Sequence, residues 1–177
     1  DARRRGLDPD DASRAARIEA GGASQAMDAL RNQRGLPWLD DLARDVRHPG
    51  ACHLYVHATE STVVPGRAEA CAAFLGKSIP GASHINHMPS HTWNEIGRWN
   101  DGVRANIQAW HSDLKAASGE GFAIYPDHNL HMLLYAASMD GQGAIATTAG
   151  RDYGRRTKET MYQVLTLVRF GRFDELP

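Results

Sequence analysis

The feature that most limits how this chain can fold is a turn that recurs between stretches of helical hydrophobic spacing. Four such turns lie near residues 65, 97, 141 and 171, so that neighbouring turns are about 30 to 44 residues apart. Residues 97–109 read "GRWNDGVRANIQA" and residues 171–176 read "GRFDEL", each with an aromatic residue two places after a glycine. Only "HLYVHA" at 53–58 also fits a strand, and its flanks favour a helix. The period predicts an all-α array of antiparallel helical hairpins, an α-solenoid.

The turn resembles the segment that joins helix A to helix B of the tetratricopeptide repeat. Gly97 with Trp99 and Gly171 with Phe173 match that segment. The sequence departs from the repeat pattern where Pro65 replaces the turn glycine and where residues 111–127 look like an insertion. In helix B, the repeat pattern has small residues at two places. Here they are Gly102, where alanine is usual, and Ala109.

The resemblance covers roughly residues 50–177 and implies about three to four TPR-like hairpins, the last one truncated. It identifies the chain as similar to a histidine-rich, bacterial-type member of this repeat family. In such arrays the first helix of each hairpin lines a concave groove. We expect residues 1–49 to form N-terminal helices that pack on the array. Because these repeats are general scaffolds, the resemblance implies a fold and not an activity.

Composition excludes several classes of protein. The 177 residues are 42% hydrophobic and 23% charged, which is typical of a folded globular chain. A formal net charge of −1 gives no field that would attract nucleic acid, and no apolar run is long enough to span a membrane. The chain opens on Asp1, so a soluble, exported or periplasmic protein whose signal has been removed stays open. Cys52 and Cys71 are too few for a disulfide framework, and their spacing leaves open whether they pair.

Seven of the nine histidines fall into three groups at helical spacing. Residues three, four or seven apart share one face of a helix. The first group also carries a carboxylate at the same spacing. The groups are His53, His57 and Glu60, then His84, His87 and His91, and finally His128 and His131.

The register of these groups places them on a common surface. His84 and His128 each lie 13 residues before a turn glycine, Gly97 and Gly141 respectively. The second histidine of each pair, His87 or His131, lies 10 residues before the same glycine. Since the family resemblance puts first helices along the groove, three histidine-bearing helices are expected to face it together.

This arrangement predicts a transition-metal site. Neutral imidazole binds zinc, copper, iron and nickel, and helix spacings of three or four let two rings reach one ion. The predicted ligands exceed the needs of one tetrahedral ion and suit two ions: His53, His57, Glu60, His84, His87, His91, His128 and His131. A single histidine on a helix is more often a hydrogen-bonded surface residue, but three groups in register are hard to obtain by chance. Pro89 either starts a helix, leaving His84 and His87 before it, or kinks one that carries all three histidines.

Other residues near the histidines are candidates for orienting ligands or contacting a substrate. Asp127 and Glu95 are the carboxylates expected to accept the second N–H of a metal-bound histidine. Trp93 and Tyr55 are expected to be packing core. His48, in a turn, and His111, on a second helix, are expected to be structural. The remaining polar candidates are Asn86, Asn94, Tyr125 and Asn129.

Three functions remain open from the sequence. The leading hypothesis is a metal-binding repeat protein that holds copper or zinc. If it is an enzyme, it is either a hydrolase with Glu60 as ligand or general base, or a copper-type oxidoreductase. The main alternative is a scaffold that grips a peptide or small molecule in its groove without catalysis, and metal storage is a third. An oligomer is compatible with each. Gly141, Gly143 and Ala146 form G-x-G-x-x-A, but a dinucleotide site needs a preceding strand, so we set it aside.

Overall fold

The computed structural model describes residues 48–120 and 123–177. Throughout these ranges the chain is α-helical with short 3-10 segments and no β-strand, which confirms the predicted all-α class. The helices expected within residues 1–49 lie outside the described residues, apart from the start of α4. The elements in chain order are α4 (Pro49–Glu60), η2 (Pro65–Ala68), α5 (Glu69–Ser78), α6 (Ser83–His87), α7 (Pro89–Glu95), α8 (Trp99–Ala117), α9 (Pro126–Met139), α10 (Gly143–Thr157), α11 (Met161–Arg169) and η3 (Phe173–Glu175).

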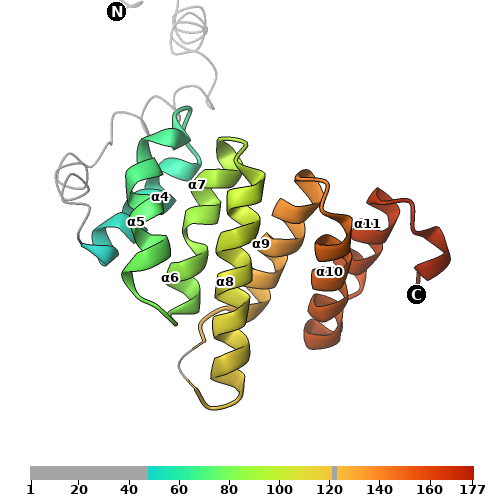
Figure 1. Ribbon diagram of the computed structural model, residues 1–177. Coiled ribbons are helices and arrows are strands. Elements are labelled where there is room, and N and C mark those ends of the chain that lie inside the picture. The colour runs from blue at the N-terminus through green and yellow to red at the C-terminus, as the bar shows by residue number, and fades with distance from the viewer. Residues whose placement is uncertain (1–47, 121–122) are drawn as a thin grey trace, which may run out of the picture. The chain divides into compact units, whose positions relative to one another are not determined.

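Helices that follow one another in the chain pack side by side. The most extensive pairings are α4 with α5, α6 and α7 with α8, α8 with α9, α9 with α10, and α10 with α11. Figure 1 shows these helices in a row that follows the order of the chain from α4 to α11. In addition, α4 contacts α7, while α9 contacts both α6 and α7. These longer-range contacts bring together the helices that carry histidine.

Three helices end in the same kind of glycine turn. Gly97, Gly141 and Gly171 have φ of 76°, 76° and 67°, a left-handed conformation that glycine adopts without the steric penalty of a side chain. In each turn, the residue after the glycine donates its N–H to the carbonyl five residues earlier, which satisfies the open helix end. The N···O distances are 2.7 Å for Arg98 to Trp93, 2.9 Å for Gln142 to Ala137 and 2.9 Å for Arg172 to Leu167.

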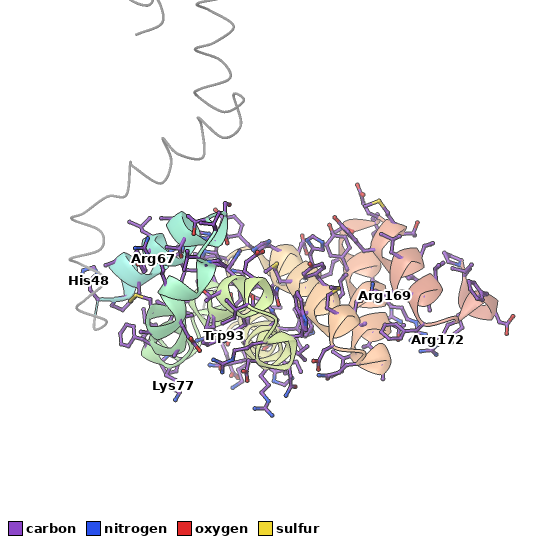
Figure 2. All side chains as sticks on the ribbon, turned by 90° about the horizontal axis from the view of Figure 1, so that it is seen from above. His48, Arg67, Lys77, Trp93, Arg169 and Arg172 are labelled. Carbon is purple, nitrogen blue, oxygen red and sulfur yellow. A yellow bond between two sulfur atoms is a disulfide. The ribbon has the colours of Figure 1, made fainter. Side chains whose placement is uncertain are left out.

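Two apolar clusters form the core of the described region. The first joins α4, α5 and α7, and the second joins α8, α9 and α10. Figure 2 looks down on the row from above, with His48 towards the α4 end, Trp93 between the ends and Arg169 towards the α11 end. Buried polar side chains lie on α6 to α9, among them Asn86, Asn106 and Asn129. Buried polar groups are costly unless they are paired, and each of these three amides donates a hydrogen bond through its Nδ2 atom.

A disulfide ties the first two helices together. Cys52 on α4 and Cys71 on α5 are bonded, with their Cα atoms 4.9 Å apart and both side chains buried. The sequence left this pairing open. Because α4 also carries His53, His57 and Glu60, the disulfide anchors the helix that presents the first histidine group.

Gly102 on α8 lies against Asn94 on α7. A Cβ at position 102 would meet Asn94 Oδ1 at 2.6 Å, closer than any ordinary contact. This contact leaves little room for a side chain at position 102. Among the described residues, neither polar atom of the buried Asn94 amide has a hydrogen-bond partner.

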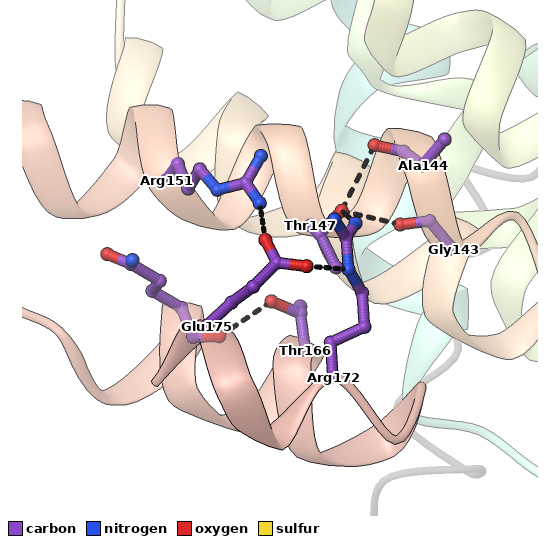
Figure 3. Close-up of polar contacts among 8 residues, drawn as sticks. Gly143, Ala144, Thr147, Arg151, Thr166, Arg172 and Glu175 are labelled. Atoms are coloured by element: carbon purple, nitrogen blue, oxygen red, sulfur yellow. Dashed lines mark hydrogen bonds and ion pairs between the residues drawn. The ribbon is translucent and has the colours of Figure 1, made fainter. Parts of the chain in front are cut away.

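The C-terminal elements are joined by charged contacts. The Glu175 carboxylate of η3 accepts hydrogen bonds from Arg151 on α10 and from Arg172, as Figure 3 shows. Arg172 in turn donates to Thr147 Oγ1 at 3.0 Å, which links the turn after α11 to α10. In the part of the chain that the structure describes, no helix has the length and apolar character to cross a membrane.

Candidate metal centre

The segment around Pro89 is divided into two short helices. α6 ends at His87 and α7 begins at Pro89, since proline has no N–H to continue the ladder. Met88 between them keeps helical angles, with φ −50° and ψ −37°, so the chain does not turn away. The outcome combines the two alternatives that the sequence left open. A helix does start at Pro89, and His84, His87 and His91 nevertheless remain on one side.

Six histidine rings from four helices form one continuous group, which we call the histidine cluster. It consists of His53 and His57 from α4, His84 and His87 from α6, His91 from α7 and His128 from α9. Neighbouring ring centroids are about 5 Å apart, for example 5.0 Å between His53 and His84 and 4.7 Å between His87 and His128. The structure therefore brings together residues up to 75 positions apart that the register of the sequence placed on one surface.

Within the cluster, two sets of three histidines have converging nitrogen atoms. The first triad is His53, His57 and His84, and the second triad is His87, His91 and His128. In each triad, one nitrogen from every ring lies within 4.8 Å of the other two. A further set, His57, Glu60 and His91, meets the same criterion and lies across the two triads.

Two further observations bear on whether these nitrogen atoms could hold a metal ion. His53 Nε2 and His84 Nε2 face each other at 3.2 Å. This separation is that of a hydrogen bond between the two rings, and it is also close to the about 3.3–3.4 Å between two ligands that lie about 2.0–2.1 Å from a tetrahedral zinc ion. His87 is fully buried, and neither of its ring nitrogens has a hydrogen-bond partner among the described residues. An ordinary core histidine would satisfy at least one of them.

Four of the six rings are held in the neutral form. Burial, followed by the repulsion that other histidines would exert on a charged ring, lowers the pKa of His84 to about 4 and that of His128 to about 4. The same causes lower the pKa of His53 and place the pKa of His87 well below its usual value. Metal binding requires unprotonated imidazole, so these four rings need lose no proton at neutral pH.

Glu60 lies between the triads. Its Oε1 is 3.2 Å from His57 Nδ1, and its Oε2 is 2.5 Å from His91 Nδ1. Burial alone would raise the pKa of Glu60, but the hydrogen bonds from His57 and His91 outweigh it and lower the pKa to about 2. Glu60 is therefore a carboxylate at neutral pH.

His131 stands apart from the cluster. Its ring lies 4.3 Å from the ring of Tyr162 and 6.3 Å from that of Tyr153, and it belongs to neither triad. On α9, a step of three residues from His128 turns the side chain by about 60° and moves it about 4.5 Å along the axis. That step directs His131 towards α10 and α11. The shared register with His87 predicted a ligand here, and the structure gives this ring aromatic neighbours instead.

The two carboxylates that were expected to orient histidine rings have different surroundings. Asp127 pairs with Arg156 at 2.6 Å, and Glu95 is exposed at the end of α7. Trp93 is 7% exposed in the first apolar cluster and Tyr55 packs against that cluster, in agreement with their predicted core role. His48 caps α4 by accepting a hydrogen bond from the Ala51 N–H at 3.0 Å.

Asn129 and Tyr125 were candidates from the sequence, but two features at these residues were not predicted. Asp113 on α8 is buried and accepts a hydrogen bond from Asn129 Nδ2 at 2.8 Å. Asn129 directly follows His128 in the chain. Tyr125 has φ of 59°, which is uncommon for a bulky residue, and its ring packs edge-on against His84 at 5.4 Å. Helical spacing could have indicated that Asp113 is buried, because it lies four and seven residues after Ala109 and Asn106 on the same face of α8. Nothing in the sequence indicates the backbone angle of Tyr125.

Comparison of the chain with models of protein families, with curated proteins and with solved structures finds no match. The function is therefore inferred from the arrangement of the histidine cluster.

Proposed function

We propose that this chain is a transition-metal-binding protein that holds two ions in its histidine cluster, one in each triad. The observation that carries the proposal is His87, a fully buried ring whose two nitrogens have no partner among the described residues while two other histidines converge on it. Burying such a ring costs free energy, and a bound ion would offset this cost.

We also propose that residues 49–177 form a TPR-like array of helical hairpins. The support is the recurrence of one glycine turn after α7, α9 and α11, together with the packing of consecutive helices. In this arrangement α4, α6, α7 and α9 are the first helices of their hairpins. The histidine cluster then lies on the face that such arrays use for binding.

Copper or zinc is the expected occupant of each triad. Three neutral imidazoles suit both ions, and copper binds more tightly to a given nitrogen site. Three protein ligands leave a fourth position for water or a substrate, as in catalytic rather than structural zinc sites. A bound ion could activate water or, in the case of copper, support oxidation, so a metalloenzyme is the extension of this proposal. The disulfide between Cys52 and Cys71 favours an oxidising compartment, in line with an exported protein.

The test is metal content after equilibrium dialysis against copper or zinc, measured by elemental analysis of the wild type and three variants. We expect two ions per chain in the wild type, one in His53→Ala and one in His128→Ala, because each substitution breaks one triad. His131→Ala is the matched control, since it removes a histidine from the same helix as His128 but outside both triads, and it should keep two ions.

Circular dichroism should confirm that each variant remains helical. A folded wild-type chain that retains no ion would refute the metal site and favour the alternative of a peptide-binding scaffold. Loss of an ion in His131→Ala would show that the triads are assigned incorrectly.

A further inference from the structure

The Glu60 carboxylate contacts one histidine of each triad. Its two oxygens are used separately, with Oε1 near His57 Nδ1 at 3.2 Å and Oε2 near His91 Nδ1 at 2.5 Å. His57 belongs to the first triad and His91 to the second. Of the carboxylates in the described residues, Glu60 is the one that hydrogen-bonds to rings of both triads.

These contacts determine which ring nitrogen carries the proton. An ionised carboxylate only accepts hydrogen bonds, so the Nδ1 atoms of His57 and His91 must each donate an N–H. In a neutral imidazole with a proton on Nδ1, the free lone pair is on Nε2. The Nε2 of His91 is buried without a partner among the described residues, which leaves it available to an ion.

The other contacts in the cluster agree with inward-facing Nε2 atoms. His53 and His84 approach each other through their Nε2 atoms at 3.2 Å. If Glu60 were itself a ligand, it would share an ion with the Nδ1 atoms of His57 and His91. That ion would take one ring from each triad and leave only two histidines in each.

We infer that Glu60 is a positioning residue shared by the two triads, which fixes the tautomer and aim of His57 and His91 so that each presents Nε2 to its ion. This inference rests on the proposed metal site and assigns Glu60 a role that differs from ligand or general base. Carboxylates that orient metal-bound histidines typically change metal affinity by about 10- to 100-fold when they are replaced. Because Glu60 serves both triads, its loss is expected to weaken both sites together.

The test compares Glu60→Gln with Glu95→Gln, which removes the same charge from an exposed position on α7. Glutamine replaces one of the two carboxylate oxygens with an NH2 donor, so in the present geometry only one of the two rings can still donate its Nδ1–H to position 60. In metal-free protein, ¹⁵N NMR of the imidazoles should show Nδ1–H on both His57 and His91 in the wild type and in Glu95→Gln. Glu60→Gln should convert at least one of them to Nε2–H.

Titration with zinc should then show affinity lowered about 10- to 100-fold at both sites of Glu60→Gln, with two ions still bound at saturation. Glu60→Asp, which keeps the acceptor charge, should recover part of the loss, and it serves as the second variant if Glu60→Gln folds poorly. Loss of one ion with the other site unchanged would overturn the inference and make Glu60 a ligand. Tautomers and affinities equal to those of Glu95→Gln would also overturn it.

The two proposals fail in different ways. A wild-type chain that binds no zinc would refute the proposed function. The tautomers of the metal-free protein would still decide whether Glu60 positions both rings, because that measurement needs no metal.

Discussion

At the contact between α7 and α8, one missing methyl group makes room for a buried amide. Gly102 leaves space for Asn94 Oδ1, which lies 2.6 Å from where a Cβ would be. α7 carries His91 of the second triad, so this contact lies between one helix of the candidate site and α8. The glycine at position 102 is thus a local fit to one neighbour.

Gly102→Ala is expected to destabilise the protein by up to about 2–3 kcal/mol. Overpacking costs about 1–3 kcal/mol, and the higher helix propensity of alanine offsets up to about 1 kcal/mol. Urea unfolding of the variant measures the difference. Gly66→Ala, where a Cβ would meet Ile96 at an ordinary 3.6 Å, is the control.

Combining Gly102→Ala with Asn94→Ala should remove the clash, so the double variant should lose less stability than the two single losses added together. Strict additivity would mean that Asn94 is not the residue that excludes a side chain at position 102.

Individual site residues could be predicted from the sequence where helical spacing alone determined them. Six of the seven histidines placed on one surface by register do meet in the cluster. His131 does not join them, because register counts residues but does not show which neighbouring helix a ring will face. The contact of Glu60 with His91 could not be predicted either, because it depends on how α4 and α7 pack, and the two residues are 31 positions apart in the chain.

At the level of elements, α4 contributes most to the site and is held by a covalent bond. It presents His53, His57 and Glu60 on one face and is bonded through Cys52 to Cys71 on α5. α5 itself carries no histidine. Its role in the site is to anchor α4 against α7.

Replacing both cysteines with alanine should lower the free energy of unfolding by about 3 kcal/mol, since the bond closes a loop of 19 residues in the unfolded chain. Thermal unfolding of the double variant, in oxidised and reduced buffer, measures this loss. Because α4 carries two ligands of the first triad, that site should weaken more than the second. Equal stability with and without the cysteines would show that the bond does not constrain this region.

Elements were easier to predict than their exact ends. The glycine turns after α7, α9 and α11 were visible in the sequence because left-handed backbone requires glycine there. The supposed insertion at 111–127 is in part a continuation of α8, which runs to Ala117. The break at Met88 could be foreseen from Pro89, but whether the rings would stay aligned could not, because this depends on the angles of one residue.

For the molecule as a whole, the histidine cluster makes stability depend on pH in the absence of metal. Folding lowers the pKa of His84 and His128 from 6.5 to about 4, so the folded state binds fewer protons than the unfolded state over this interval. Their contribution to stability is therefore present above pH 6.5, falls as the pH drops towards 4 and changes little below that. Folding lowers the pKa of Glu60 from 4.5 to about 2, so its contribution to stability is lost as the pH falls from 4.5 towards 2.

In a chelator, the metal-free chain should lose on the order of 2 kcal/mol of stability between pH 6.5 and pH 4, allowing for partial solvent exposure of these rings. Urea unfolding at a series of pH values measures the slope. His84→Gln with His128→Gln should flatten it, whereas His111→Gln, an exposed histidine on α8, should not. A stability that rises as the pH falls from 6.5 would contradict the neutral, buried state of the cluster.

The most direct test of the central claim is X-ray absorption at the metal edge of the chain loaded with two zinc ions. Both ions should have nitrogen or oxygen neighbours at about 2.0–2.1 Å, with about three imidazole rings per ion and no sulfur. A spectrum with one imidazole or none per ion would contradict the two triads, as would a chain that releases its metal on dialysis.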